Sequence, residues 1–135
     1  MSVSVALQDL LADLLKNNTA VTSIVGNRGY DGPKPDAAFP YWNFAATDTV
    51  RTDADCISSR EETVQIDCWS RDQGKLWPCK KLVDAVSAAL HEQEGEMSVG
   101  ALVSLDVVLT RVFLDPDGKT AHGVVQVTAS IEDPV

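Results

Sequence analysis

The stretch ALVSLDVVLTRVFL-DPDG-KT-AHGVVQVTASI, residues 101–131, decides the fold. On both sides of DPDG, apolar residues alternate with polar ones, and this period of two is typical of β-strands. Within DPDG, Pro116 suits the second position of a type I turn and Gly118 supplies the positive φ that follows. The pattern predicts two long strands, 101–114 and 121–131, joined as a hairpin. The inward residues on these two strands are predicted to be Val103, Leu105, Val107, Leu109, Val125, Val127, Ala129 and Ile131.

A second pair of strands precedes this hairpin. Residues 41–51 begin after Pro40 and are predicted to be a strand, and residues 60–70 alternate in the same way. The polar stretch TDADCISS, residues 52–59, lies between them and predicts a hairpin with a mobile tip. The side chains expected on the apolar faces are Trp42, Phe44, Ala46 and Val50 on the first strand, and Val64, Ile66 and Cys68 on the second.

Two segments carry the 3.6-residue periodicity of amphipathic helices, at 3–17 and at roughly 74–92. Ser2 or Ser4 suits the start of the first helix. Pro78 is tolerated only in the first turn of a helix, so the second helix is expected to begin near Trp77. Residues 21–25 are predicted to form a short apolar turn, and the Gly- and Pro-rich stretch 26–38 a loop with a short strand near 28–31.

These elements predict one α+β domain over residues 1–135. The expected fold is an antiparallel sheet of about four main strands, with two amphipathic helices packed on one face, in the order α-β-β-α-β-β. A parallel doubly wound sheet is disfavoured because strands do not alternate with helices.

The composition limits the function. The chain has 135 residues, is 44% hydrophobic and carries a net charge of −9, which suits a globular domain. A chain this acidic is not expected to bind nucleic acid or an anionic membrane through bulk electrostatics. It shows no signal-peptide pattern and no membrane-span pattern, so we expect a cytoplasmic protein unless another component carries it out.

No set of residues indicates catalysis. His91 and His122 are the only histidines: a helix end suits the first, and the second follows the DPDG turn. The run DPDGKT lacks the third ligand position and the glutamate of a calcium loop. Cys56, Cys68 and Cys79 match neither a zinc site nor a disulfide framework, and the last two are expected to be buried thiols. We therefore expect no catalytic residue, no metal ligand and no cofactor.

Trp69 and Trp77 allow two readings. Trp69 is expected on the face of its strand opposite Val64, Ile66 and Cys68, and Trp77 at the edge of the apolar helix stripe. Exposed aromatic side chains can mark protein contacts. Equally, the start of the helix or a neighbouring loop could cover them.

Several stretches, taken in order, carry a family resemblance. They are IVGNRGYDG at 24–32, AFPY at 38–41, VQIDCWS at 64–70, the helix end at 85–90, and RVFLDPDG at 111–118 with His122-Gly123. This series resembles the tail-terminator or tail-completion proteins of long-tailed phages, prophages and gene transfer agents. No single stretch is a specific motif, and the resemblance rests on the succession, which spans almost the whole chain. Trp77-Pro78 departs from the family, in which charged residues are more usual at this helix.

The resemblance implies an α+β structural subunit without catalytic residues that assembles into a hexameric ring. Such a ring caps the head-proximal end of the tail tube, stops tube growth and offers the head connector a joining surface. The expected partners are further copies of the chain, the tail tube protein and the head–tail connector or adaptor proteins, with DNA passing through the lumen without tight binding. The expected location is the tail or neck of the virion, and the host cytoplasm during assembly.

Within that ring, particular residues are predicted to make contacts. The loops 26–38 and 52–59 and the turn 115–120 are candidates for axial contacts, because loops can become ordered on binding. Six copies of a −9 subunit could also line the channel with carboxylates that repel DNA phosphates. The candidate axial or inter-subunit contacts are Arg28, Tyr30, Asp31, Trp69, Trp77, Asp115, Asp117 and His122, and the candidate lumen acids are Asp48, Asp53 and Asp55.

Three other functions stay open at this stage. The chain could be another neck component, such as a head-completion or head–tail joining factor. It could be a small cytosolic ligand-binding domain or enzyme, which would need a polar pocket with clustered ionisable groups. A nucleic-acid-binding regulator is opposed by the acidity and by the absence of a basic stripe.

Overall fold

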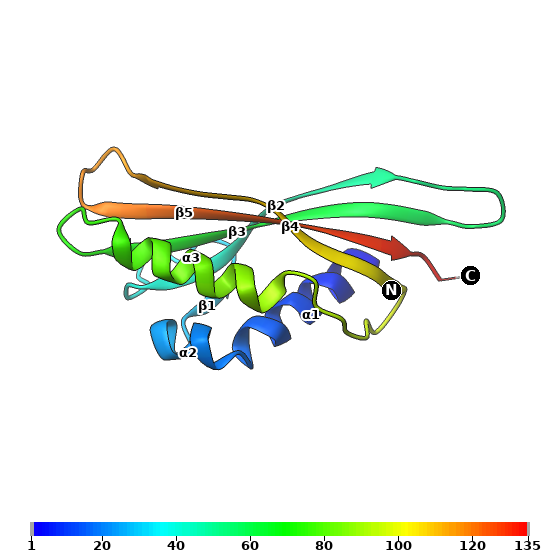
Figure 1. The fold of residues 1–135 in the computed structure, drawn as a ribbon, viewed down its shortest axis with the longest axis horizontal. Helices are drawn as coiled ribbons and strands as arrows, with labels where there is room; N and C mark the ends of the chain where they lie inside the picture. Colours follow the sequence, from blue (N-terminus) through cyan, green and yellow to red (C-terminus); the bar gives the residue numbers. More distant parts are fainter. Residues whose placement is uncertain (1, 135) are drawn as a thin grey trace.

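The computed structural model describes residues 2–134 and consists of one five-stranded sheet with three helices on one side of it (Figure 1). The elements in chain order are α1 (Val3–Lys16), α2 (Thr19–Val25), β1 (Gly29–Asp31), β2 (Tyr41–Arg51), β3 (Ser59–Arg71), α3 (Trp77–Leu90), β4 (Ala101–Leu114) and β5 (Thr120–Glu132). The α+β class and the placement of the helices on one face agree with the sequence prediction. None of the helices within residues 2–134 combines the length and the hydropathy needed to cross a membrane.

The sheet differs from the prediction in strand number and direction. Its order is β1-β2-β3-β5-β4, so the two predicted hairpins join through the antiparallel pairing of β3 with β5. The short strand predicted near residues 28–31 forms β1 and pairs with β2 in parallel, which makes the sheet mixed. A parallel partner needs a connection longer than a tight turn, and the Gly- and Pro-rich segment 32–40 supplies one.

The helical layer contains one helix more than predicted. The segment predicted as a short turn forms α2, because Asn18 caps it by accepting the Val21 N–H at 3.1 Å and Gly26 ends it at φ +61°. Ser2 caps α1 as expected, and α3 begins at Trp77 with Pro78 in its first turn. Helix α3 lies against β3, β4 and β5, and α1 and α2 pack beside it.

The core lies between this helical layer and the inner face of the sheet. Each large aliphatic side chain buried there contributes about 1.5–3 kcal/mol relative to an exposed one. Gly123 on β5 allows α3 to approach closely, because a Cβ at this position would collide with Val83 Cγ2 and meet Cys79 Sγ at 3.0 Å. Fully buried core side chains include Leu7, Leu11, Leu15, Trp42, Ile66, Leu82, Leu90, Leu105 and Ile131.

Two predicted strand faces are wrong in part because β-bulges interrupt them. The register of β2 against β3 shifts between Phe44 and Thr47, so the residues after the shift exchange faces. As a result Val50 does not share the inner face with Trp42, and its side chain is 62% exposed. Shifts in β4 at 102–104 and 107–109 likewise leave Val103 and Leu109 exposed, although Leu105 is buried as predicted.

Candidate assembly surfaces

An aromatic row crosses the outer face of the sheet, opposite the helices. Each of the five strands contributes one ring, and neighbouring ring centroids lie 3.9–6.3 Å apart. In sheet order the rings belong to Tyr30, Tyr41, Trp69, His122 and Phe113. The closest pair is Trp69 with His122, which stack at 3.9 Å with an interplanar angle of 12°. A stacked pair contributes about 0.5–1.5 kcal/mol beyond its buried area, so the row stabilises the outer face as a defined surface.

Polar partners fix the orientation of the central rings. Trp69 Nε1 donates to Asn43 Oδ1 at 2.7 Å, and His122 Nε2 lies 2.9 Å from Asp67 Oδ1. On its other side, His122 Nδ1 lies 3.8 Å from Asp115 Oδ1. Among residues 2–134, no serine, threonine or cysteine side chain is hydrogen-bonded to His122, so the histidine and its carboxylates do not form a nucleophilic triad.

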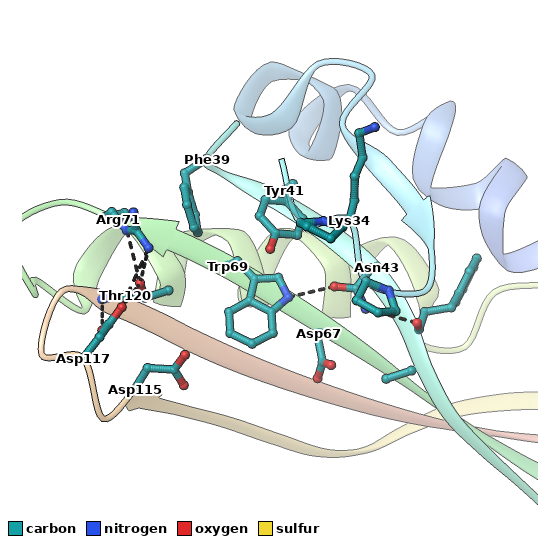
Figure 2. Close-up of a pocket in the computed structure, with 14 residues that line it drawn as sticks. Lys34, Phe39, Tyr41, Asn43, Asp67, Trp69, Arg71, Asp115, Asp117 and Thr120 are labelled. Carbon is teal, nitrogen blue, oxygen red and sulfur yellow. Dashed lines mark hydrogen bonds and ion pairs between the residues drawn. The ribbon is translucent and has the colours of Figure 1, made fainter. Parts of the chain in front are cut away.

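An open groove lies beside this row, between segment 33–41 and the turn 115–120 (Figure 2). Its volume is about 450 Å³. Its aromatic walls come from Phe39, Tyr41 and Trp69, and its carboxylates from Asp67, Asp115 and Asp117. Burial is the main cause of the raised pKa of the Tyr41 hydroxyl. A wall of rings and carboxylates is suited to polar protein contacts, and the open shape does not enclose a small substrate.

Asp117 holds the turn of the β4–β5 hairpin. Its side chain accepts from the Thr120 hydroxyl at 2.7 Å and from the backbone N–H groups of Lys119 and Thr120 at 2.8 Å each. The Thr120 hydroxyl, followed by these two N–H groups, lowers the pKa of Asp117 to about 2. Gly118 has φ +70°, as the turn sequence predicts. The carboxylate is therefore occupied by the turn itself, although the turn borders the groove.

The remaining predicted contact residues do not gather with the row. Arg28 is an internal brace, since its guanidinium donates to Pro40 O at 2.8 Å and to Ile24 O at 3.4 Å. Asp31 is exposed at the end of β1. Trp77 lies at the start of α3 with 61% of its surface exposed, so neither the helix start nor a loop covers it.

The three predicted lumen acids lie on the projecting end of the β2–β3 hairpin, residues 45–60, which is called the arm below. In Figure 1 its tip extends past the helical layer at one end of the long axis. Asp53 is not a free charge: it pairs with Arg51 at 2.6 Å and accepts the Ser59 N–H at 3.0 Å, and the bond from Arg51 is the main cause of its lowered pKa. Asp48 and Asp55 are exposed, and neither forms an ion pair with any residue between 2 and 134.

The base of the arm is fixed by ion pairs to Asp133 and by hydrogen bonds from Ser4 and Thr49. Asp133 accepts from Arg51 at 2.7 Å and from Arg60 at 2.8 Å. The carboxylate of Glu62, which is fully buried, accepts from Ser4 on α1 at 2.7 Å and from Thr49 on β2 at 3.1 Å. These contacts hold the arm in one direction relative to the helices.

The strand β4 forms one edge of the sheet, and no other strand within residues 2–134 pairs with its outer side. The middle of this edge is capped, because Glu92 N–H donates to Leu105 O at 2.8 Å and His91 Nδ1 accepts the Val107 N–H at 3.0 Å. Four apolar side chains on β4 are exposed: Val103, Val108, Leu109 and Leu114. An edge strand with exposed apolar side chains favours contact with another chain. At the other side of the sheet, the short strand β1 covers three residues of β2.

One group of side chains within residues 2–134 has ligand atoms close enough to share a metal ion. His91, Glu92 and Asp106 offer ligand atoms within 4.8 Å of one another. His91 Nδ1, however, accepts the Val107 N–H at 3.0 Å, so the imidazole already caps a backbone donor of the edge strand. Exposed acidic groups commonly lie this close without binding a metal ion.

The cysteines are free thiols in two environments. Cys68 and Cys79 are buried, and Cys56 is exposed at the tip of the arm. Burial raises the pKa of Cys79 to about 11 and that of Cys68 well above its usual range. The burial of Cys68 and Cys79 confirms the sequence prediction, and buried thiols with raised pKa values are inert.

The sequence prediction missed four residues of the outer-face cluster, a name used below for the aromatic row together with Asn43 and Asp67. Tyr41, Phe113, Asn43 and Asp67 complete the row and its hydrogen bonds, yet each belongs to an ordinary alternating strand. Only the register reveals the cluster, since it places Tyr41 opposite Trp69 and Phe113 opposite His122. Strand pairing between distant segments was the missing signal.

Comparison with known proteins shows the family to which the chain belongs. The family model described as "Tail completion protein gp17" matches residues 9–132, nearly the whole chain. The chain belongs to this family of tail completion proteins. Its members are structural proteins of the phage tail, so this chain is a structural protein of the virion tail and not an enzyme.

Solved structures give the same fold. A chain from the virion of a native gene transfer agent particle superposes with a TM-score of 0.89 at 20% identity, covering 97% of this chain and 98% of the other. The gp17 protein of bacteriophage SPP1 superposes with a TM-score of 0.62, also at 20% identity, covering 95% and 90%. Comparison with curated proteins gave no match. Tail completion is a role at the end of the tail, which involves assembly with other virion proteins.

Proposed function

We propose that this tail completion protein forms a closed ring of six copies at the head-proximal end of the tail tube, where it terminates tube growth and presents the joining surface for the head connector. The observation that carries the proposal is the combination of family membership with the exposed apolar side chains on the edge strand β4. Identical subunits joined head to tail close into a ring when the rotation between them permits.

The outer-face cluster and the exposed loops supply surfaces for the axial partners. The aromatic row and the adjoining groove are ordered by hydrogen bonds before any partner binds, which lowers the entropic cost of docking. The segments 26–38 and 115–120 border this groove, and the segment 52–59 lies at the arm tip. We infer that the two segments at the groove contact the tail tube protein or the connector.

The acidity of the subunit suits a channel that DNA crosses without binding. Six copies, each with a net charge of −9, repel phosphates wherever their carboxylates face the lumen. Asp48 is the strongest candidate for this role, since Arg51 neutralises much of the charge of Asp53 and Asp55 lies at the arm tip. Asp48→Asn is expected to slow DNA ejection, and unchanged ejection would remove this position from the lumen.

The test of the proposed function is tail assembly with and without the protein. Tube protein polymerised in its absence should give tubes of uncontrolled length without heads, and addition of the purified chain should stop elongation and restore head attachment. A rival role as a head-completion factor predicts normal tube length and a defect on the head side. Tubes of normal length in the absence of the chain would therefore contradict termination.

A further inference from the structure

We propose that the arm of one copy docks into a basic, apolar groove at the start of α3 in the next copy of this chain. This inference rests on the proposed ring and names a contact between neighbouring subunits in addition to the β4 edge. The groove adjoins the outer-face groove, and Phe39 and Arg71, which contact each other, line both.

The groove is apolar with a positively charged rim. It has a volume of about 350 Å³, and its apolar walls include Ile24, Phe39, Pro40 and Trp77. Its charged lining residues are two bases and one acid, Arg71, Lys81 and Asp72. Trp77 is 61% exposed, although tryptophan is among the residue types that most often anchor protein contacts when buried by a partner. This exposure is unexplained by the fold of a single copy.

The surface around the groove is positively charged, although the chain as a whole is negatively charged. Residues 71–81 contain four of the 11 basic residues and a single acid, in a chain with a net charge of −9. Lys75, Lys80 and Lys81 are exposed, and none of them forms an ion pair with a residue between 2 and 134. A locally positive, unpaired surface on an acidic protein is suited to an acidic, partly apolar partner.

The arm has the matching properties. Its tip carries the carboxylates Asp53 and Asp55, and Asp55 has no ionic partner within residues 2–134. Ile57 beside them is 48% exposed, so an apolar side chain stands among the acids. The tip can therefore place Ile57 against Trp77 while Asp55 meets Lys81.

The geometry favours a neighbour over the arm's own body. The arm tip and the start of α3 lie at opposite ends of the long axis (Figure 1), so the arm cannot reach its own groove. Two complementary surfaces at opposite ends of one subunit make a head-to-tail contact, which is the type that generates rings. The ion pairs and the Ser4–Glu62 hydrogen bond at the base of the arm fix the direction in which it projects.

The exposed thiol of Cys56 allows a direct test, because the other two cysteines are buried. The variant Lys81→Cys, assembled on tail tubes and oxidised with copper phenanthroline, should form disulfide-linked multimers through Cys56 of the neighbouring copy. The matched control is Ala88→Cys, on the same face of α3 and about 10 Å further along the helix, which should not cross-link. Adding Cys56→Ser to Lys81→Cys should abolish the ladder.

Charge exchange gives an independent readout. Lys80→Glu with Lys81→Glu should weaken subunit association by about tenfold or more, because like charges then face each other, and adding Asp55→Lys should recover most of the loss. Electron microscopy of the same samples reports whether rings form. Rings without cross-linking or charge rescue would overturn the arm contact and leave the proposed function standing. Absence of any ring would overturn both.

Discussion

Replacing Gly123 with alanine is expected to push α3 away from the sheet. The new Cβ would collide with Val83 Cγ2, and it would lie 3.0 Å from Cys79 Sγ and 3.2 Å from Cys68 Cβ. These neighbours belong to a buried interface between helix and sheet, so they cannot move freely. The helix must shift or its side chains must leave their preferred rotamers.

The magnitude follows from two opposing effects. Overpacking a core by one methyl group costs about 1–3 kcal/mol, and removing a glycine from the unfolded chain returns about 0.4–1 kcal/mol. The free energy of unfolding of Gly123→Ala should therefore fall by about 1–2 kcal/mol. For a domain of this size, that change lowers Tm by about 3–8 °C.

The assay is urea unfolding followed by tryptophan fluorescence and circular dichroism, with Val83→Ala as the compensating variant. Val83→Ala alone should be destabilising, since it leaves space in the core. In the double variant the alanine methyl at 123 occupies that space, so the combined loss should be smaller than the sum of the two single losses by about 1 kcal/mol. Strict additivity, or a Gly123→Ala protein as stable as the parent, would refute the close approach of α3 to β5.

Three further predictions concern the outer face and the thiols. Asp117→Ala should lower Tm at neutral pH, and this loss of Tm should shrink as pH falls from about 4 to about 2. The reason is that the hydrogen bonds that lower the pKa of Asp117 stabilise the folded state only while the carboxylate is ionised. A loss of Tm that does not change with pH would contradict the turn contacts. Trp69→Phe keeps the stacking but leaves the buried Asn43 Oδ1 without its donor, and should cost about 1–2 kcal/mol in urea unfolding; an unchanged midpoint would show that this bond contributes nothing. In the native protein Ellman's reagent should modify Cys56 rapidly, and Cys68 and Cys79 only after unfolding; three fast thiols would contradict the buried packing.

The sequence was sufficient for the elements whose signals are local. The DPDG turn fixes the β4–β5 hairpin, and the position of Pro78 locates the start of α3 at Trp77. What failed depends on contacts between distant segments. The bulge after Phe44 moves Val50 to the outer face, and no local pattern announces such a shift. The short strand β1 was predicted from its local sequence, but its parallel pairing with β2 was not.

The candidate contact residues divide in the same way. Tyr30, Trp69 and His122 were predicted individually, and the structure brings them together in one row with Tyr41 and Phe113. Arg28, which resembled a surface residue of a glycine-rich loop, is occupied in bracing that loop. The residues next to Arg28 in the sequence do not reveal which carbonyl groups its long side chain contacts.

Cryo-electron microscopy of the head-proximal end of tail tubes assembled with this chain tests the central claim most directly. The account predicts a single six-fold ring of this subunit on the last layer of the tube, with the arm of each copy reaching the start of α3 in its neighbour. Tube ends that carry isolated copies, or an open helical continuation of the chain along the tube, would contradict a ring that ends tube growth.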